Sequence, residues 1–182
     1  MIDITRFADL VPGDHGLAVI ALALPDKTVH ASVTNAGVLD HPVTGASVVG
    51  IVAGGGSRKL THLRSHPRAT VVLRVGWRWA AVEGPVEIAG PDDPLEGVGA
   101  ERLRLLLCEI FTAAGGTHDD FDAYDKAMAA ERRAAILVTD PRLAAKFGIF
   151  GRLTSGEQIP RIEQLTARGP RRHRAVSRLG RL

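Results

Sequence analysis

The chain has 182 residues, of which 45% are hydrophobic and 24% charged. These proportions are ordinary for a globular protein, and the length suffices for one domain with a sizeable core and a tail. No apolar run approaches the roughly 18 residues that a membrane span requires. The acidic N-terminal stretch does not have the pattern of a secretory signal. Cys108 is the one cysteine, so no internal disulfide can form, and we expect a cytoplasmic protein.

The formal net charge of +3 is distributed unevenly. Residues 152–182 contain eight arginines and two glutamates, a net charge of +6, which leaves −3 for residues 1–151. The basic character therefore belongs to the tail, and it gives no support for nucleic-acid binding by the body of the protein. We expect residues 1–151 to form the folded domain and residues 152–182 to be a disordered or loosely packed arm.

The first half of the chain is predicted to be mostly β. A short helix over residues 3–11 should end at Pro12-Gly13, and a turn at Pro25 should join the first two strands. A loop is expected over residues 37–45, followed by an apolar strand over residues 46–53 that is buried on both faces. Alternation and β-branched residues indicate the remaining strands. The strands predicted in this half are residues 16–24, 28–36, 46–53, 69–75 and 77–89.

The second half is predicted to be mainly helical. Leucines at core spacing indicate a helix over residues 95–114, which Gly115-Gly116 should end. A second helix is expected over residues 119–133 and a sixth strand over residues 134–139. Residues 142–150 fit either a strand or a short helix. The early strands are joined by turns too short for crossover helices, so the whole pattern favours a small mixed antiparallel barrel.

The segment GGGSRK, residues 54–59, is the strongest candidate for a binding site. Glycines allow close approach of a ligand, and the amides that open a helix favour anions. Ser57 should cap a helix over residues 58–65 that His66-Pro67 ends. The spacing does not match a P-loop or a dinucleotide fingerprint. The alternative is a flexible glycine turn that leads into a basic helix face.

Trp77 and Trp79 stand two residues apart, so on a strand their side chains share one face. They could be core or dimer-interface aromatics, or one of them could stack against a planar ligand. By the same parity, Arg74 and Arg78 should lie on the opposite face.

Other reactive side chains are assigned no chemistry. His62 and His66 have a spacing that could bind zinc, but the HExxH glutamate is missing, so solvated or capping histidines are favoured and no metal site is predicted. Cys108 lies in an apolar helix pattern and should be a structural thiol. The acidic cluster beginning at Asp119 is interpreted as compensation of a helix dipole. Catalytic residues remain unassigned.

Residues 16 to about 140 resemble the flavin-binding split-barrel superfamily related to pyridoxamine 5′-phosphate oxidase. The likeness is greatest to its actinobacterial branch of reductases that use the deazaflavin coenzyme F420. It rests on the strand from Val48 to Ala53, on GGGSRKLTHLRSHPRATVVL and on RWAAVEGPVEI. The loop of residues 37–45 is shorter than is usual in that family, the helical pair is longer than in its minimal members, and the basic tail has no counterpart.

The resemblance implies a mostly β protein with helices (α+β), built as a six-stranded antiparallel split β-barrel of the FMN-binding type. It also implies a homodimer with cofactor grooves at the interface, and hydride transfer from F420 to an unsaturated small-molecule substrate. One alternative is an FMN-binding oxidoreductase of the same fold. Another is a non-enzymatic protein that binds flavin, F420 or haem.

The resemblance also implies a set of cofactor-binding residues. Ser57, Arg58 and Lys59 would hold the phosphate, and residues 50–53 would run along the tricyclic ring. Polar residues of the second strand would line the groove, and the tryptophans would approach from the partner subunit or the groove wall. The predicted set is Ser32, Thr34, Asn35, Gly50, Ile51, Val52, Ala53, Gly56, Ser57, Arg58, Lys59, Leu60, Arg74, Trp77 and Trp79.

Overall fold

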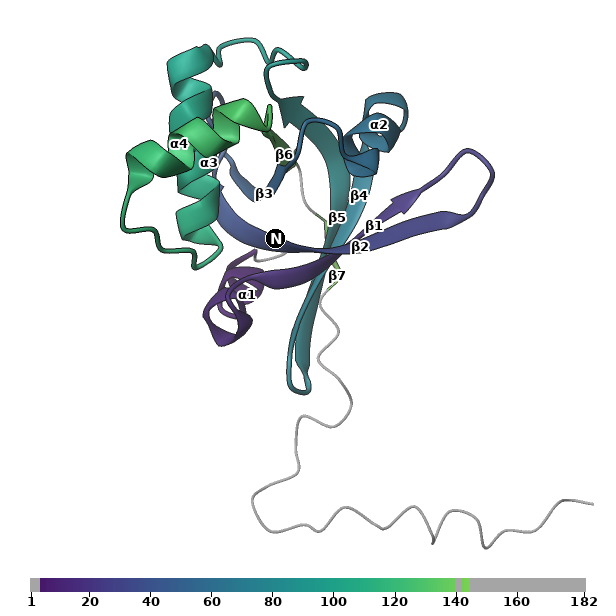
Figure 1. Ribbon diagram of the computed structural model, residues 1–182. Helices are drawn as coiled ribbons and strands as arrows, with labels where there is room; N and C mark the ends of the chain where they lie inside the picture. Colours follow the sequence, from purple (N-terminus) through teal and green to yellow (C-terminus); the bar gives the residue numbers. More distant parts are fainter. Residues whose placement is uncertain (1–3, 140–141, 145–182) are drawn as a thin grey trace, which may run out of the picture. The chain divides into compact units, whose positions relative to one another are not determined.

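A computed structural model describes residues 4–139 and 142–144, and it shows a β-barrel with helices on its outside (Figure 1). The strands are β1 (Leu17–Ala23), β2 (Val29–Asp40), β3 (Ser47–Ala53), β4 (Arg68–Val75), β5 (Arg78–Ala89), β6 (Ala134–Val138) and β7 (Arg142–Ala144). The helices are α1 (Thr5–Ala8), the 3₁₀ helix η1 (Val11–Asp14), α2 (Arg58–Ser65), α3 (Ala100–Ala113) and α4 (Phe121–Ala130).

Six antiparallel strands close the barrel in the order β4-β1-β2-β3-β6-β5, with β5 returning to β4. Closure depends on two long strands, each of which pairs with different neighbours along its length. The first part of β2 pairs with β1 and its last residues pair with β3. In the same way β5 pairs first with β4 and then with β6. The predicted six-stranded α+β split barrel is therefore confirmed, and the short β7 adds to β5 at Ala81–Glu83.

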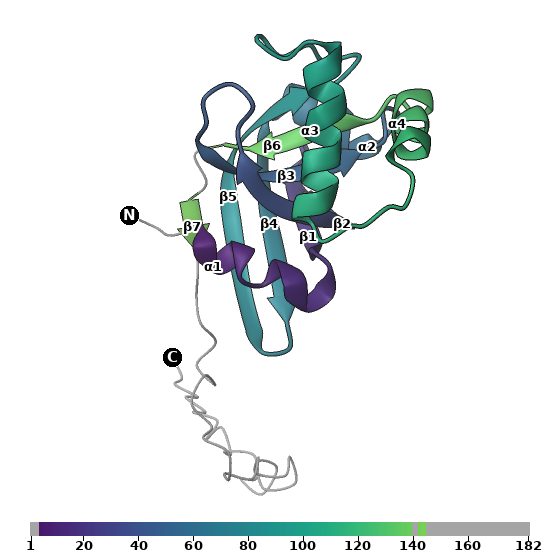
Figure 2. The same cartoon turned by 90° about the vertical axis from the view of Figure 1, so that its left-hand side faces the viewer.

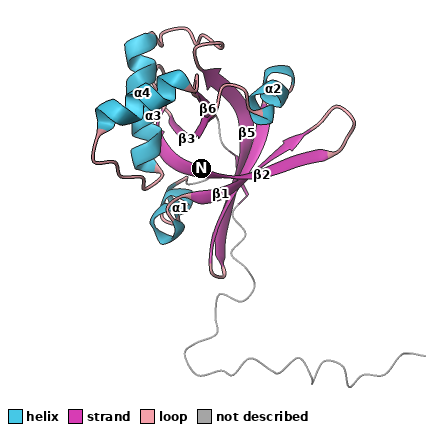
Figure 3. Cartoon of the chain, viewed as in Figure 1, coloured by secondary structure: helices cyan, strands magenta, loops and turns pink. Residues whose placement is uncertain are grey.

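The hydrophobic core lies on both faces of β3 and β6. One cluster fills the barrel and includes Ile51 and Ile136, while the other lies between the sheet and α3 and includes Val48 and Ile110. Every residue of β6 is buried because the barrel interior covers one face and α3 the other. Figure 2 shows α3 lying across the outside of the strands, and Figure 3 shows α2 apart from the α3–α4 pair. The expected burial of β3 on both faces is thus confirmed.

Several predicted boundaries were wrong. β2 continues to Asp40, beyond the predicted end at residue 36, because its last residues pair with β3. α3 begins at Ala100 and not at residue 95, since Gly97 has a φ of +82° that a helix cannot continue through. Pro12-Gly13 lies inside η1 and does not end a helix, because proline suits the first turn of a new helix.

The last predicted helix is also shorter than expected. Asp120 accepts a hydrogen bond from the Ala123 amide and caps α4, and Arg132, with a φ of +48°, follows the helix end. Of residues 142–150, Arg142–Ala144 form the strand β7, and the others lie outside the described residues. The expectation for residues 152–182 also falls outside them. Within the described part of the chain, no helix is long and apolar enough to cross a membrane.

Candidate functional site

A cavity of about 720 Å³ opens where β2 leaves β3. β2 pairs with β1 up to Asn35 and with β3 from Ala36, which lies opposite Ile51. After Ile51, β3 has no β2 partner and stays paired with β6. Residues 33–35 and 52–54 on the two diverging strands line the cavity. Where two neighbouring strands separate, the main-chain donors and acceptors on their facing edges point into the space between them. The volume lies within the range of small-molecule sites.

Helices α3 and α4 and their connection supply the opposite wall. Phe111, Tyr124 and Met128 contribute apolar side chains, and the rings of Phe111 and Tyr124 lie 4.8 Å apart between centroids. The Tyr124 hydroxyl donates to the Leu107 carbonyl at 3.3 Å, and burial raises the pKa of Tyr124 to about 12. The Tyr124 phenol in this wall therefore stays protonated at neutral pH. The full lining is His15, Val33, Thr34, Asn35, Val52, Ala53, Gly54, Lys59, Ile110, Phe111, Ala114, Gly115, Gly116, Thr117, Tyr124, Met128 and Arg133.

The three glycines after β3 have different environments. The Gly55 amide donates to the Glu131 carbonyl at 3.2 Å, and a Cβ at Gly55 would lie 2.5 Å from the Arg132 carbonyl oxygen. In contrast, a Cβ at Gly54 or Gly56 would meet no atom of the protein within 4 Å. Gly55 is thus required for packing against the turn after α4, and Gly54 leaves the backbone open to the cavity that it lines.

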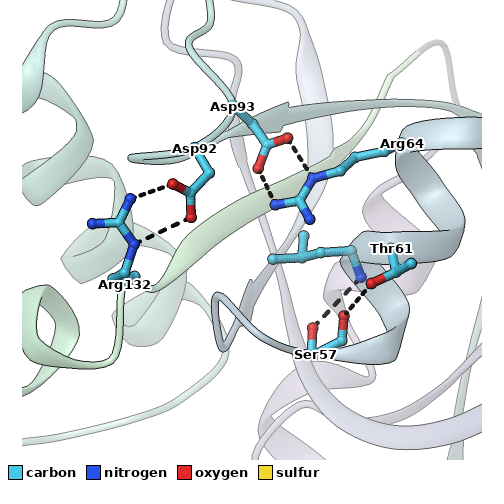
Figure 4. A network of polar contacts seen from close by, with 7 residues as sticks. Ser57, Thr61, Arg64, Asp92, Asp93 and Arg132 are labelled. Atoms are coloured by element: carbon cyan, nitrogen blue, oxygen red, sulfur yellow. Dashed lines mark hydrogen bonds and ion pairs between the residues drawn. The ribbon is translucent and has the colours of Figure 1, made fainter.

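Ser57 caps α2, as its sequence position predicts. Its Oγ accepts a hydrogen bond from the Leu60 amide at 3.5 Å, and its carbonyl accepts one from the Thr61 hydroxyl (Figure 4). The cap begins the helix directly after the glycines and sets Lys59 in its first turn. Lys59 then reaches across to β2, where its Nζ donates to Ser32 Oγ at 3.4 Å.

Two arginine–aspartate pairs hold the segments around the glycines together (Figure 4). Arg64 of α2 donates two hydrogen bonds to Asp93, at 2.7 and 2.8 Å. Arg132, after α4, makes a two-pronged contact with the neighbouring Asp92 and lowers the pKa of that carboxyl. The turn after β5 is therefore tied both to α2 and to the chain that enters β6.

The charged side chains that line the cavity are basic. Lys59 and Arg133 line it, and none of the described residues in its lining is an aspartate or glutamate. Opposite charges nearby and a low-dielectric wall favour an anionic ligand. The cavity can thus hold a partly apolar molecule that carries a phosphate or carboxylate group.

The structure brings together part of the predicted site. The predicted residues that line the cavity are Thr34, Asn35, Val52, Ala53 and Lys59. Ser32 lies beside them through its contact with Lys59.

The other predicted residues lie elsewhere in this chain. Ile51 and Leu60 are fully buried in the core, and a Cβ at Gly50 would lie 2.8 Å from Ile110 under α3. Gly56, Ser57 and Arg58 flank the cavity without lining it. Arg74 and Trp79 pair at the far end of the β4–β5 hairpin, next to Trp77, which is 79% exposed.

Sequence reasoning missed the wall formed by α3 and α4. In the sequence, Gly115-Gly116 indicates only the end of a helix, whereas in the structure both glycines line the cavity. Phe111, Met128 and Arg133 had no signal of their own, because an amphipathic helix pattern does not distinguish a core face from a cavity face.

Cys108 is the structural thiol that its helix pattern predicts. Its Sγ donates to Asp125 Oδ1 at 3.2 Å, and burial, followed by this hydrogen bond, raises the pKa of the thiol to about 11. The nucleophilic thiolate is therefore scarce at neutral pH.

We expect Cys108 to titrate with a midpoint near pH 11, measured by thiolate absorbance, and to alkylate slowly at pH 7 to 8. The same thiol in urea-unfolded protein is the control and should titrate near its ordinary value. Removing the carboxylate charge with Asp125→Asn should lower the midpoint in the folded protein. A folded-state midpoint below the unfolded one would contradict this placement.

No protein-family model matches the sequence. Solved structures match its fold. A conserved hypothetical protein from Mycobacterium tuberculosis is 19% identical, with 79% of this chain and 84% of that chain covered and a TM-score of 0.54. A candidate 5-nitroimidazole antibiotic resistance protein from Bacteroides thetaiotaomicron is 15% identical over 76% and 80% of the two chains, with a TM-score of 0.53.

A third match is a pyridoxamine 5′-phosphate oxidase-related, FMN-binding protein from Nostoc punctiforme. It is 13% identical over 74% of each chain, with a TM-score of 0.51. The fold and the strand order define this chain as a split barrel of the type found in FMN-binding proteins. At these identities the likeness establishes the fold alone.

Proposed function

We propose that this protein is an oxidoreductase that binds coenzyme F420 in the cavity between β2 and β3 and delivers hydride to an unsaturated acceptor. The observation that carries the proposal is the cavity itself. It lies at the split of the barrel, two diverging strand edges form one side, and lysine and arginine but no carboxylate line it among the described residues. The FMN-binding protein of the same fold supports a flavin-type cofactor, and the sequence resemblance favours the deazaflavin.

The residues present fit such a cofactor. Gly54 leaves space for a ligand beside the backbone, and Lys59, in the first turn of α2, supplies a charge for a phosphate. One residue of the pair Val52 and Ala53, and one of the pair Thr34 and Asn35, can turn its main-chain donor and acceptor to the cavity, because alternate residues of a strand face opposite edges. The predicted roles of Ser57 and Arg58 in holding the phosphate stay predictions.

A bound reduced deazaflavin would supply the hydride, and the protein would bind and orient the ring and the substrate. Val52, Met128 and Phe111 present apolar side chains to the cavity and would exclude water from that side of a bound ring. Asn35 is held by donating its side-chain amide to the His15 carbonyl at 2.8 Å, which fixes the rim of the cavity.

The alternative cofactor is FMN, which also carries a phosphate, and binding of flavin, F420 or haem without turnover is the non-enzymatic alternative. Equilibrium dialysis of the purified protein against F420, FMN or haem, with the bound ligand measured by its own absorbance, separates them. We expect F420 to bind most tightly at micromolar concentrations or below. Tighter binding of FMN would reassign the cofactor. Binding without hydride transfer to a panel of enones and quinones would favour the binding protein, and failure of all three ligands would refute the proposal.

The second part of the proposal is a homodimer. β1, β2 and β4 carry an exposed apolar row in which Val19 pairs with both Val33 and Val72, and Val19 and Val33 are 40% and 62% exposed. Exposed apolar sheet faces of this kind commonly mark subunit interfaces. Val33 also lines the cavity, so a partner on this face would border the bound ligand.

We expect Val19→Asp to convert a dimer into a monomer, measured by sedimentation at micromolar concentration, because an unpaired carboxylate would be buried in the interface. Glu96→Gln, at an exposed position remote from this row in the sequence, is the control and should stay dimeric. A wild-type protein that sediments as a monomer would remove the dimer from the proposal and leave the cavity unaffected.

A further inference from the structure

We infer that Arg133 is the second cation of the anion site, and that it binds the anionic group of the ligand together with Lys59 on either side of Gly54. This inference deepens the proposed function and depends on the same cavity. No motif in the sequence marks Arg133. Its role follows from its position next to Gly54 in the β3–β6 register and from the turn that ends α4.

The β3–β6 register places Arg133 beside Gly54. Ala53 pairs with Ala134 at the end of the ladder, so the next residues outward are Gly54 on one strand and Arg133 on the other. Both line the cavity. Lys59 of α2 lines the same cavity, and its Nζ donates to Ser32 of β2. The two cations therefore line one cavity from different elements.

The end of α4 determines the direction in which Arg133 leaves the helix. The Arg133 amide donates to the Met128 carbonyl at 2.9 Å and the Arg132 amide to the Ala129 carbonyl at 3.1 Å, which is the Schellman pattern. Arg132 occupies its left-handed position, with a φ of +48°, where glycine is usual. Its side chain goes to Asp92, and the following residue turns into the cavity.

The glycine segment is fastened to this turn. Gly55 donates to the Glu131 carbonyl, and its lack of a side chain allows the Arg132 carbonyl to approach. The positions of Gly54 and Arg133 are thus coupled through one packed contact, and the anion site is preorganised before a ligand arrives.

The Arg133 guanidinium retains binding capacity. Its Nε and Nη2 lie 2.8 and 2.6 Å from Glu131 Oε2. A guanidinium has five N–H donors, so this single carboxylate oxygen orients the group and leaves donors for a ligand. Arg58, the arginine that the sequence favours, is exposed and does not line the cavity.

The test compares Arg133→Gln with Arg102→Gln in the full chain. Arg102 is a matched control because it also pairs with a glutamate, Glu109, but lies on α3 outside the cavity lining. The probes are FMN and riboflavin, which differ by the phosphate, together with F420. We expect Arg133→Gln to weaken FMN and F420 by roughly tenfold or more and to leave riboflavin unchanged. Arg102→Gln should bind all three as the wild type does.

Two results would overturn the inference while the proposed function stands. Wild-type affinity of Arg133→Gln for FMN and F420 would exclude a contact with the anion. An equal loss for FMN and riboflavin would reduce Arg133 to a part of the cavity wall.

A titration with inorganic phosphate tests the anion site independently of the proposed cofactor. If the wild type binds no flavin or deazaflavin, the proposed function fails, and phosphate is titrated while the Gly54 amide and the Arg133 Nε–H resonances are followed by NMR. Saturable shifts at both groups would support the anion site, and their absence would overturn it. This measurement uses the wild-type chain, so it also decides the question if Arg133→Gln does not fold.

Discussion

Replacing Lys59 by alanine should weaken the binding of phosphate-bearing cofactors by roughly 1.5–3 kcal/mol, the scale of a hydrogen bond to a charged group. Lys59 lines a cavity whose described lining contains no carboxylate, so its charge is not neutralised from within the site. Its contact with Ser32 Oγ, at 3.4 Å, is long and can yield to a ligand. Titration with FMN and F420 at constant ionic strength measures the loss.

Riboflavin and a second lysine supply the controls for this prediction. Riboflavin has no phosphate, so its affinity should be the same for Lys59→Ala and the wild type. Lys126 is exposed on α4 and lies outside the cavity lining, and Lys126→Ala should leave both affinities unchanged. Equal affinity of Lys59→Ala and the wild type for FMN would remove Lys59 from the site. Because salt screens the attraction between the lysine and the phosphate, the difference in FMN affinity between the wild type and Lys59→Ala should also shrink as salt is added.

Replacing Gly55 by alanine should lower the free energy of unfolding by about 1–3 kcal/mol, as is usual when a methyl group is forced into a packed contact. The added Cβ would lie 2.5 Å from the Arg132 carbonyl oxygen and 2.9 Å from Arg132 Cβ. The closest of these atoms belongs to the backbone, which cannot rotate away as a flexible side chain can. Urea unfolding followed by tryptophan fluorescence measures the change.

Gly56→Ala is the matched control, one residue further along the same loop. Its Cβ would meet no atom within 4 Å, and Gly56 is not among the glycines with positive φ. Alanine there should leave stability unchanged or raise it by about 0.4–1 kcal/mol, because it restricts the unfolded chain. If both variants lost the same stability, the close packing of Gly55 on the turn after α4 would be disproved.

The two predictions together test one unit of structure. Gly55 holds the loop against the turn that precedes β6, and the loop positions the start of α2, where Lys59 lies. Gly55→Ala should therefore weaken FMN binding as well as stability, whereas Lys59→Ala should affect FMN binding alone. Measuring FMN affinity and the free energy of unfolding for each variant distinguishes a distorted loop from the loss of a charge.

Local patterns in the sequence determined the elements of the barrel and half of its site. β-branched alternation predicted the strands, the continuous apolar run predicted that β3 is buried on both faces, and Ser57 with His66-Pro67 predicted both ends of α2. Each of these features depends on residues close together in the chain. The same holds for Lys59, whose place in the first turn of α2 follows directly from the cap.

Only the tertiary structure decided what faces that half site. The cavity exists because β2 follows β1 up to Asn35 and pairs with β3 only from Ala36 onward, and its other wall comes from α3, α4 and Arg133, far along the chain from Lys59. The parity prediction for the hairpin was wrong: Arg74 pairs with Trp79, so their side chains share a face, and Trp77 lies in the turn before β5, where alternation does not apply. Hydrophobic periodicity shows which side of an element is apolar but not which distant segment covers it. The contact of Gly55 with Arg132 joins two distant segments, so the sequence pattern could not predict it.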